Sequence, residues 1–211
     1  MQHGVIVIRT EEPDYSMYKS TEHDWFYTCY SGAKEELPDD LPKAYGRRIV
    51  ISSFVDANLM HDLISGKSLT GILHFFNKTP IDWFTKLQAT VETATFGSEY
   101  VAARQCTEQV TDLRLTLRYL GVRVDGPSYM FGDNKSVVDT ASVPHGKLQK
   151  RHNILSFHRT RFAIAAKILN FFHISGKGNP AEVLSKHWDF PSAWPMLKPL
   201  LFWPGNSGLP P

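Results

Sequence analysis

Long hydrophobic runs are missing from this sequence of 211 residues. No uninterrupted apolar run approaches the roughly 18 residues that a membrane-spanning helix needs. The first thirty residues contain five acidic side chains, a composition unlike that of a signal peptide. We therefore expect an intracellular protein, in a cytoplasmic particle or in the nucleus, that is neither secreted nor inserted in a membrane.

Cysteine is equally scarce. The sequence contains two cysteines, Cys29 and Cys106, which lie 77 residues apart and form no CxxC spacing. This number is too small for a zinc site built from cysteines or for a disulfide framework. We therefore expect both thiols to be reduced.

Acidic residues are absent from one long stretch, between Thr140 and Ala181. Residues 140–211 contain 9 Lys and Arg against 2 Asp and Glu, whereas residues 1–47 contain 5 against 9. A segment of one charge sign favours a polyanionic partner. The alternative is a solvated face whose charge is balanced by acids elsewhere in the fold, and charge alone leaves both open.

The composition is that of a globular protein, with 42% hydrophobic and 12% aromatic residues. The length suits one domain with appendages rather than two full domains. We expect an acidic N-terminal arm or connector over residues 1–47, a main domain over residues 48–188, and an aromatic and proline-rich tail over residues 189–211.

Runs of β-branched and aromatic residues predict strands, and apolar residues at helical spacing predict helices. The predicted strands cover residues 49–55, 69–76, 81–84, 128–131 and 168–174; the predicted helices cover 95–120, 135–140 and 153–167, with a last helix opening at 179. This order, βββαβααβα, indicates an α/β fold with a mixed sheet flanked by helices.

Four carboxylates fall where this arrangement would expose them at one end of the sheet. Two follow strands and two lie in the first turns of helices: Asp56, Asp133, Glu99 and Glu182. Ligands of open α/β sheets gather at the carboxyl ends of the strands. Clustered carboxylates need counter-charge, and Mg²⁺ prefers oxygen ligands. The four side chains therefore predict a site for two metal ions that hydrolyses a phosphodiester.

Each carboxylate also has an ordinary structural explanation, and the residues alone leave both explanations open. Asp56 and Asp133 are of a type that is common where a strand ends. Glu99 suits the positive end of a helix dipole. Glu182 follows Asn179 and Pro180 in a good helix-capping arrangement.

Seven short segments together resemble the sequence blocks of one protein family. They occur in the family's order between about Arg48 and Trp188, at residues 53–58 (SFVDAN), 67–71 (KSLTG), 80–83 (PIDW), 95–102 (TFGSEYVA), 132–137 (GDNKSV), 150–153 (KRHN) and 179–186 (NPAEVLSK). The family is the ribonuclease H domain of copia-type LTR retrotransposon polyproteins. A single such block would be weak evidence, but seven in order are specific.

The resemblance implies a ribonuclease H-like fold with a five-stranded mixed sheet. It also implies an endoribonuclease that cuts the RNA strand of RNA–DNA hybrids with two Mg²⁺ ions, for which Mn²⁺ can substitute. By position, Asp56, Glu99 and Asp133 correspond to the family's first three metal-binding acids. Glu182 stands where the family has aspartate, so we expect it to hold the second metal less well, with weaker activity or a preference for Mn²⁺.

The same resemblance implies an RNA–DNA hybrid as partner, and a longer polyprotein with an upstream reverse transcriptase. Hybrids are recognised by groove shape, phosphates and the 2′-hydroxyl. The residues that we expect to bind the nucleic acid are Lys147, Lys150, Arg151, His152, Arg159 and Arg161. His173 is a candidate for an auxiliary role in product release, with a half-buried strand histidine as the alternative.

Two other functions remain open. Ribonuclease H folds also occur as inactive connection modules, and the altered fourth acid would suit a module that only supports a reverse transcriptase. An integrase or resolvase nuclease has the same fold class and acidic cluster, but these domains often bring a zinc module that two cysteines cannot build. Retention of Asp56, Glu99 and Asp133 favours an active ribonuclease H.

Overall fold

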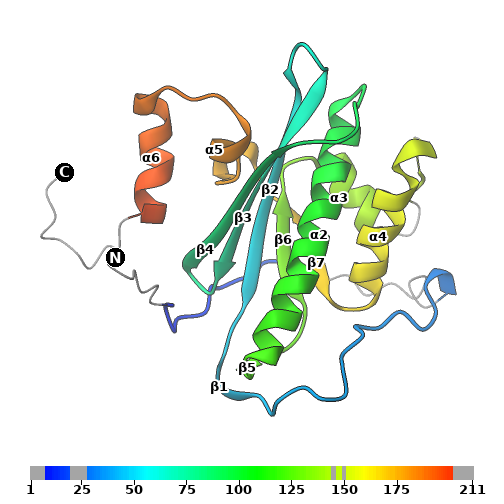
Figure 1. The fold of residues 1–211 in the computed structure, drawn as a ribbon, viewed down its shortest axis with the longest axis vertical. Coiled ribbons are helices and arrows are strands. Elements are labelled where there is room, and N and C mark those ends of the chain that lie inside the picture. Colours follow the sequence, from blue (N-terminus) through cyan, green and yellow to red (C-terminus); the bar gives the residue numbers. More distant parts are fainter. Residues whose placement is uncertain (1–7, 20–27, 144–145, 149–150, 202–211) are drawn as a thin grey trace, which may run out of the picture.

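The computed structural model describes residues 8–19, 28–143, 146–148 and 151–201, which fold around a five-stranded sheet (Figure 1). In spatial order its strands are β4 (Thr79–Leu87), β3 (Lys67–Phe76), β2 (Ile51–Asp62), β6 (Ser128–Gly132) and β7 (Leu169–His173). The first three pair antiparallel, and β6 and β7 run parallel to β2. The mixed sheet of the ribonuclease H-like fold is thereby confirmed.

The helices follow the predicted order. They are α2 (Thr95–Tyr119), α3 (Lys135–Ser142), α4 (Ile154–Ala165), α5 (Glu182–Ser185) and α6 (Phe190–Leu201), with 3₁₀ turns η1 (Arg151–Asn153) and η2 (Gly176–Gly178). Helices α2, α3 and α4 cover one face of the sheet (Figure 1). The main core lies between them and the sheet, where Val55 and Met130 of the strands meet Tyr100 of α2 and Phe157 of α4. Among the described residues, no helix is both long and apolar enough to span a membrane.

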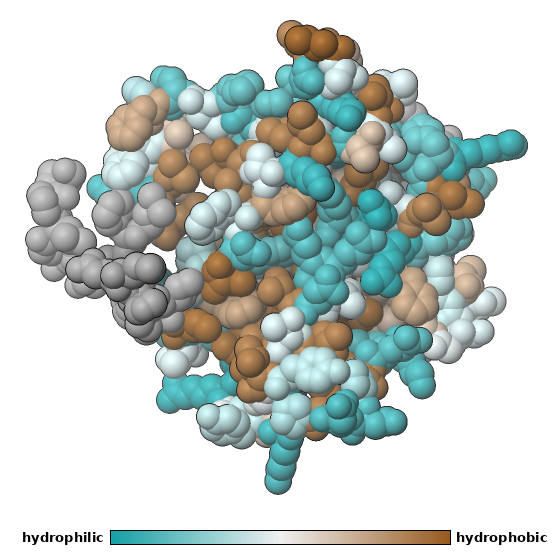
Figure 2. Space-filling model, in the orientation of Figure 1, coloured by the Kyte–Doolittle hydropathy of each residue, from teal (hydrophilic) through white to brown (hydrophobic). Residues whose placement is uncertain are grey.

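The first strand of the sheet is longer than the sequence predicts. We predicted that it ends before Asp56, and this is wrong, because β2 continues to Asp62 by pairing antiparallel with β3. The two strands form a hairpin that projects beyond the rest of the sheet, and Leu63 and Ile64 at its tip are exposed. Figure 2 shows the hydrophobic side chains of this tip at the top of the view. Asp56 therefore lies in a paired strand, where its backbone is fixed.

Two further features depart from the sequence pattern. A small parallel sheet, formed by β1 (Tyr45–Arg48) and β5 (Val122–Arg123), ties the end of the arm to the connection after α2. The described part of the tail contains α6 although Pro195 and Pro199 lie inside it. Proline removes a backbone donor and disfavours a helix interior, which is why the pattern gave no helix there.

The second face of the sheet is covered by the N-terminal arm. Tyr129 and Phe131 flank Met130 on β6, which packs in the core against the helices, so both rings point to the opposite face of the sheet. The ring centroid of Tyr15 lies 4.6 Å from that of Tyr129, and the ring of Tyr18 lies 5.0 Å from Phe131 and 5.3 Å from Phe172. The arm therefore supplies part of the packing that this sheet face requires.

A buried ionic contact attaches the arm to α2 as well. The carboxylate of Glu35 accepts hydrogen bonds from both Arg114 and Arg118, among them one from Arg114 Nε at 2.7 Å. The Arg114 side chain is 3% exposed and the Glu35 side chain 16% exposed, so this pair is largely shielded from solvent. Burial alone would raise the pKa of Glu35, but the hydrogen bonds from the two arginines outweigh it and hold that pKa below its ordinary value. Arg114 also donates to the carbonyl of Gly126 and to Ser128. The arm, the helix and the start of β6 thus share one arginine.

The Glu35→Gln variant should lose about 3 kcal/mol of unfolding free energy at neutral pH, because it leaves a buried guanidinium without its counter-charge. Since the folded-state pKa of Glu35 is depressed, its contribution is present above the unfolded-state pKa and is lost as the pH falls. Urea unfolding at several pH values measures both effects. The exposed neighbour Glu36 is the matched control, and equal losses for Glu35→Gln and Glu36→Gln would contradict this account.

Candidate metal centre

The strand register brings two aspartates side by side. Parallel pairing of β2 with β6 aligns Phe54 with Phe131, and two residues further along each chain stand Asp56 and Asp133. Each of these two side chains offers an oxygen that lies within 4.8 Å of the other and of an oxygen of Glu99. The structure therefore brings together three of the four predicted acids.

Glu99 reaches the same point from α2. It lies in the second turn of that helix and is 6% exposed. The residues before it, Gly97 and Ser98, are small and buried, so the start of the helix packs closely on its surroundings. A carboxylate on the buried side of a long, rigid helix is held in one place, as a metal ligand must be.

The surroundings of the cluster disfavour the ionised forms of Glu99 and Asp56. The pKa of Glu99 is raised well above its ordinary value, first because the side chain is buried and then because Asp56 and Asp133 carry the same charge. Burial also raises the pKa of Asp56, and the hydrogen bond from Ser185 and the charge of Lys186 oppose this effect. A buried cluster of like charges with oxygen donors at this spacing fits hard divalent cations, which supply the missing positive charge.

Glu182 lies beside this cluster without joining its inner group. A side chain built on Gly176 would come within 3.0 Å of Asp133 Oδ2 and 3.3 Å of Glu182 Oε1, so both carboxylates border the same glycine. The carboxylate of Glu182 accepts a hydrogen bond from Lys186 at 2.8 Å. Lys186 Nζ also lies 3.9 Å from Asp56 Oδ2. The fourth predicted acid is thus engaged with a lysine.

Helix α5 is fastened directly to the strand that carries Asp56. Asn179 donates to the carbonyl of Val55 at 2.9 Å and accepts from the backbone N–H of Ala181 at 3.1 Å. Ser185 donates a hydrogen bond to the Asp56 carboxylate. Gly71 pairs with Asp56 across the hairpin, and any side chain there would meet the backbone of α5 at about 3 Å. A glycine at this register therefore admits the short helix to the site.

Sequence reasoning missed Ser185, Lys186 and Gly71. The signal for the first two is present, since they follow Glu182 at spacings of three and four, where side chains of one helical turn share a face. Gly71 is visible only once the register with Asp56 is known. Asn179 was predicted as the N-cap of the last helix, and this is wrong, because α5 begins at Glu182 after Ala181. The Asn179 side chain instead joins the segment before α5 to the neighbouring strand.

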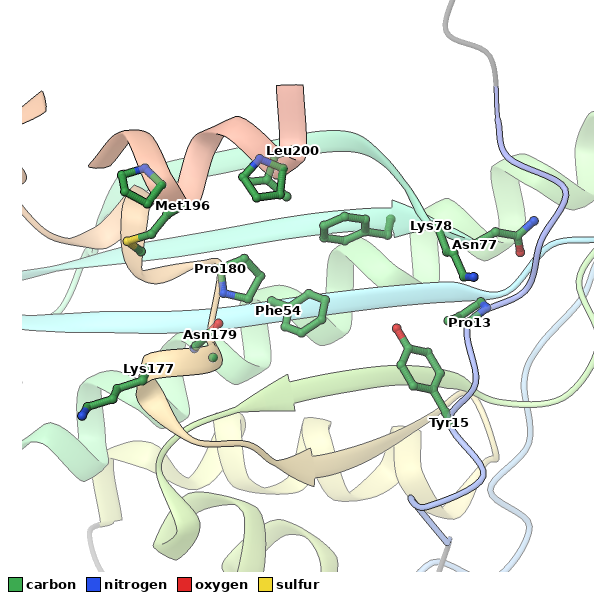
Figure 3. Close-up of a pocket in the computed structure, with 14 residues that line it drawn as sticks. Pro13, Tyr15, Phe54, Asn77, Lys78, Lys177, Asn179, Pro180, Met196 and Leu200 are labelled. Atoms are coloured by element: carbon green, nitrogen blue, oxygen red, sulfur yellow. The ribbon is translucent and has the colours of Figure 1, made fainter. Parts of the chain in front are cut away.

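Asn179 and Pro180 also border a cavity of about 530 Å³ on the arm side of the sheet, together with Phe54 and Tyr15 (Figure 3). The sticks in Figure 3 show Pro180 and Asn179 lying next to Phe54 on β2, with the Tyr15 ring further along the same groove. None of the four acids lines this cavity. The carboxylate cluster, rather than the cavity, is the candidate for chemistry.

His173 ends strand β7 next to the cluster. Its side chain is exposed, and its Nε2–H donates to the backbone carbonyl of Asp133 at 3.1 Å. The alternative of a half-buried strand histidine does not describe this exposed side chain. An auxiliary role of His173 remains a prediction.

The predicted nucleic-acid residues differ in their accessibility. Lys147 and Arg151 are exposed and Arg159 is half-buried, whereas Lys150 lies outside the described residues. His152 is exposed, and its Nε2 lies 2.9 Å from the fully buried carboxylate of Glu92.

Arg161 is the exception among these residues, being 3% exposed. Its guanidinium donates to the carbonyls of Thr140 and Val143 at 2.7 and 3.0 Å, and it packs over the ring of Phe157. These contacts give it a structural role between α3 and α4, because a side chain used in this way has no surface to offer to a phosphate. The prediction that Arg161 contacts nucleic acid is therefore corrected.

Comparison with known proteins finds relatives among plant transposon proteins, although no family model matches. The Retrovirus-related Pol polyprotein from transposon TNT 1-94 of Nicotiana tabacum is 28% identical over 137 residues, which is 65% of this chain and 10% of that protein. Those from transposons RE1 and RE2 of Arabidopsis thaliana are 22% identical over 141 residues, 67% of this chain and again 10% of each protein. The chain is thus similar in sequence to retrotransposon Pol polyproteins, and its described residues have a ribonuclease H-like fold. It spans about a tenth of the length of these relatives.

Solved structures with similar folds include two ribonucleases H. The N-terminal RNase H domain of rv2228c from Mycobacterium tuberculosis has a TM-score of 0.49 at 12% identity, covering 65% of this chain and 91% of that one. LC11-RNase H1, isolated from compost, has a TM-score of 0.49 at 17% identity, covering 64% and 91%. The fold assignment itself rests on the strand order and register described above.

The Glu99→Gln variant should make the metal-free protein more stable at neutral pH. Because the folded-state pKa of Glu99 lies above its ordinary value of 4.5, the folded protein holds this proton more tightly than the unfolded chain does, so metal-free stability falls as the pH rises above that value. Removing the charge should raise Tm in EDTA by roughly 2 to 4 °C, on the order of 1 kcal/mol, and should abolish stabilisation by divalent cations. Thermal unfolding between pH 5 and 8, with EDTA or Mg²⁺, measures both.

Glu108 is the matched control, since it lies on the same helix with a side chain 41% exposed, paired to Arg104 on the surface. Glu108→Gln should leave the response to metal intact. A lower Tm for Glu99→Gln in EDTA at neutral pH would show that the carboxylates are not repelling one another.

Proposed function

We propose that this chain is a metal-dependent endoribonuclease that hydrolyses the RNA strand of RNA–DNA hybrids, as part of a copia-type retrotransposon polyprotein. The ribonuclease H-like fold and the relationship to transposon Pol polyproteins support a ribonuclease H-type nuclease. The observation that carries the finer proposal is the convergence of Asp56, Glu99 and Asp133 within 4.8 Å. We further propose an intracellular setting and an upstream reverse transcriptase in the full polyprotein.

Asp56 occupies the centre of the proposed mechanism. It belongs to the triad, and it shares the neighbour Lys186 with Glu182, so we place it at both proposed ion positions, with Glu99 at one and Glu182 at the other. The hydrogen bond from Ser185 fixes one of its oxygens, and Asn179 fixes the backbone beside it. Glu99 and Asp133 complete the first ion site from the helix and from the end of β6.

The proposed ions are two Mg²⁺, with Mn²⁺ able to substitute, because the donors are hard carboxylate oxygens. When bound, such a pair activates an attacking water and stabilises the leaving oxygen of a phosphodiester. The chain's own residues fix the positions of the acids and limit the entry of water around Glu99. They leave one side of the cluster open to the phosphate. The exposed side chain of His173, which bonds to the backbone carbonyl of Asp133, lies at that side.

The hybrid would be positioned by backbone contacts rather than by reading of bases. Lys147, Arg151 and His152 are exposed ahead of α4, and Arg159 lies within that helix. Phosphate contacts of this kind orient a duplex but carry no sequence information. We therefore propose these four residues as the hybrid-binding surface, with little sequence preference.

A second candidate function is that of an inactive connection module that supports a reverse transcriptase. The observation that favours it is the pairing of Glu182 with Lys186, which removes the fourth acid from the inner group. Both functions predict binding of a hybrid, so activity rather than binding separates them.

Cleavage of a labelled RNA–DNA hybrid tests the proposal, in Mg²⁺, Mn²⁺ and EDTA, with single-stranded RNA, duplex RNA and duplex DNA as controls. We expect metal-dependent cuts in the RNA strand of the hybrid alone. The Asp56→Asn variant should reduce the rate by about 100-fold or more, because it removes a shared ligand of both ions. Ser185→Ala, which keeps the Asp56 carboxylate but loses the hydrogen bond to it and a longer one to the carbonyl of Glu182, should retain part of the activity.

A folded protein that binds the hybrid but cuts it in neither metal would favour the inactive connection module. Equal cleavage by the parent protein and by Asp56→Asn would overturn the assignment of the site.

A further inference from the structure

A lysine side chain enters the acid cluster at the place where the fourth carboxylate should complete it. Lys186 Nζ lies 2.8 Å from Glu182 Oε1 and 3.9 Å from Asp56 Oδ2. The Glu182 and Asp56 side chains are 16% and 2% exposed, so the two carboxylates of this contact are largely shielded from water. An ordinary surface pair of this spacing contributes little, but charges in a shielded site interact strongly.

The local sequence explains how the lysine is held. Glu182 begins the single turn of α5, and Lys186 is the C-cap residue that follows it, four positions after the acid, so the lysine side chain reaches back to the Glu182 carboxylate. Glu182 has one methylene more than the aspartate of the family that the sequence resembles, and the longer side chain can bend back to its own lysine. Ser185, between them in sequence, donates to Asp56 and so fixes α5 against β2.

We propose that Lys186 is a built-in counter-ion, which takes the place of the second divalent cation between Asp56 and Glu182 and must leave before that cation can bind. This inference rests on the proposed two-metal function. The triad of Asp56, Glu99 and Asp133 takes the first ion without competition. The second ion competes with the ammonium of Lys186, which already contacts the two carboxylates that would bind that ion, Asp56 and Glu182.

The position of Lys186 allows its ammonium group to leave the site. Its side chain is 37% exposed, so the flexible stem can carry the ammonium into solvent when a divalent ion replaces it. In the metal-free protein the same ammonium lies 2.8 Å from Glu182 Oε1 and 3.9 Å from Asp56 Oδ2, so it lowers the electrostatic repulsion between these acids. Lys186 is thus a positioning residue, which sets how much metal the site needs.

The test is metal binding by Lys186→Met, a variant of similar length without the charge. Isothermal titration with Mg²⁺ and with Mn²⁺ counts the ions and gives their affinities, and thermal unfolding in EDTA reports the repulsion between the acids. We expect the second ion to bind the variant about tenfold more tightly, because one positive charge has left its site. We also expect a lower Tm in EDTA together with a larger rise in Tm on addition of metal.

Two matched variants separate the charge from other effects. Lys186→Arg keeps the positive charge, so its Tm in EDTA should stay close to that of the parent protein. Lys177→Met removes an exposed charge on the adjacent η2 turn, with no carboxylate partner among the contacts of the described residues, and should leave the affinity of the second ion unchanged.

Equal affinities and numbers of ions in the parent protein and in Lys186→Met, with the first ion still bound, would overturn the counter-ion role and leave the proposed function standing. Absence of any bound ion in both proteins would overturn the two together. Tight binding of the second ion by Lys177→Met as well would also contradict the proposal, because the effect would then come from net charge.

Discussion

Mutual repulsion among Asp56, Glu99 and Asp133 is the constraint around which this domain is arranged. Three carboxylates with oxygens within 4.8 Å repel one another, and the burial of Asp56 and Glu99 makes their negative charges more costly. The segment of α5 offsets part of this repulsion, because Ser185 donates a hydrogen bond to Asp56 and the ammonium of Lys186 lies next to the same carboxylate. Gly71 leaves room for that helix beside the strand pair. The metal-free cluster is therefore costly to the fold, and divalent cations would relieve that cost.

The N-terminal arm belongs to the folded unit rather than to its surroundings. Without Tyr15 and Tyr18, the aromatic face of β6 and β7 would stand open to water, and exposed patches of that kind are unfavourable. The buried pair between Glu35 and Arg114 attaches the arm to the helix that carries Glu99. A ribonuclease H-like domain of this chain cut at residue 48 would lose both contacts, so the arm and the metal centre are physically connected through α2.

The order of elements and three members of the site follow from the sequence, because alternating and helical apolar patterns report burial directly. The aspartate predicted beyond the first strand lies inside it instead, since the pairing of β2 with β3 is a long-range property that no local pattern near Asp56 records. For Arg161 the local pattern misled in another way. Its charge indicated a solvent-exposed side chain, whereas in the structure it is buried and donates to the carbonyls of Thr140 and Val143. The contact of Lys186 with Asp56 joins residues 130 positions apart, and only the fold reveals it.

A crystal soaked in Mn²⁺, with anomalous scattering used to locate the metal, tests the central claim most directly. The account predicts a strong peak coordinated by Asp56, Glu99 and Asp133, and a weaker one between Asp56 and Glu182 that grows as Mn²⁺ is raised. The second peak should be weaker because the ammonium of Lys186 already occupies the second ion position. A crystal that takes up Mn²⁺ elsewhere on its surface but shows no peak at the three carboxylates would contradict it.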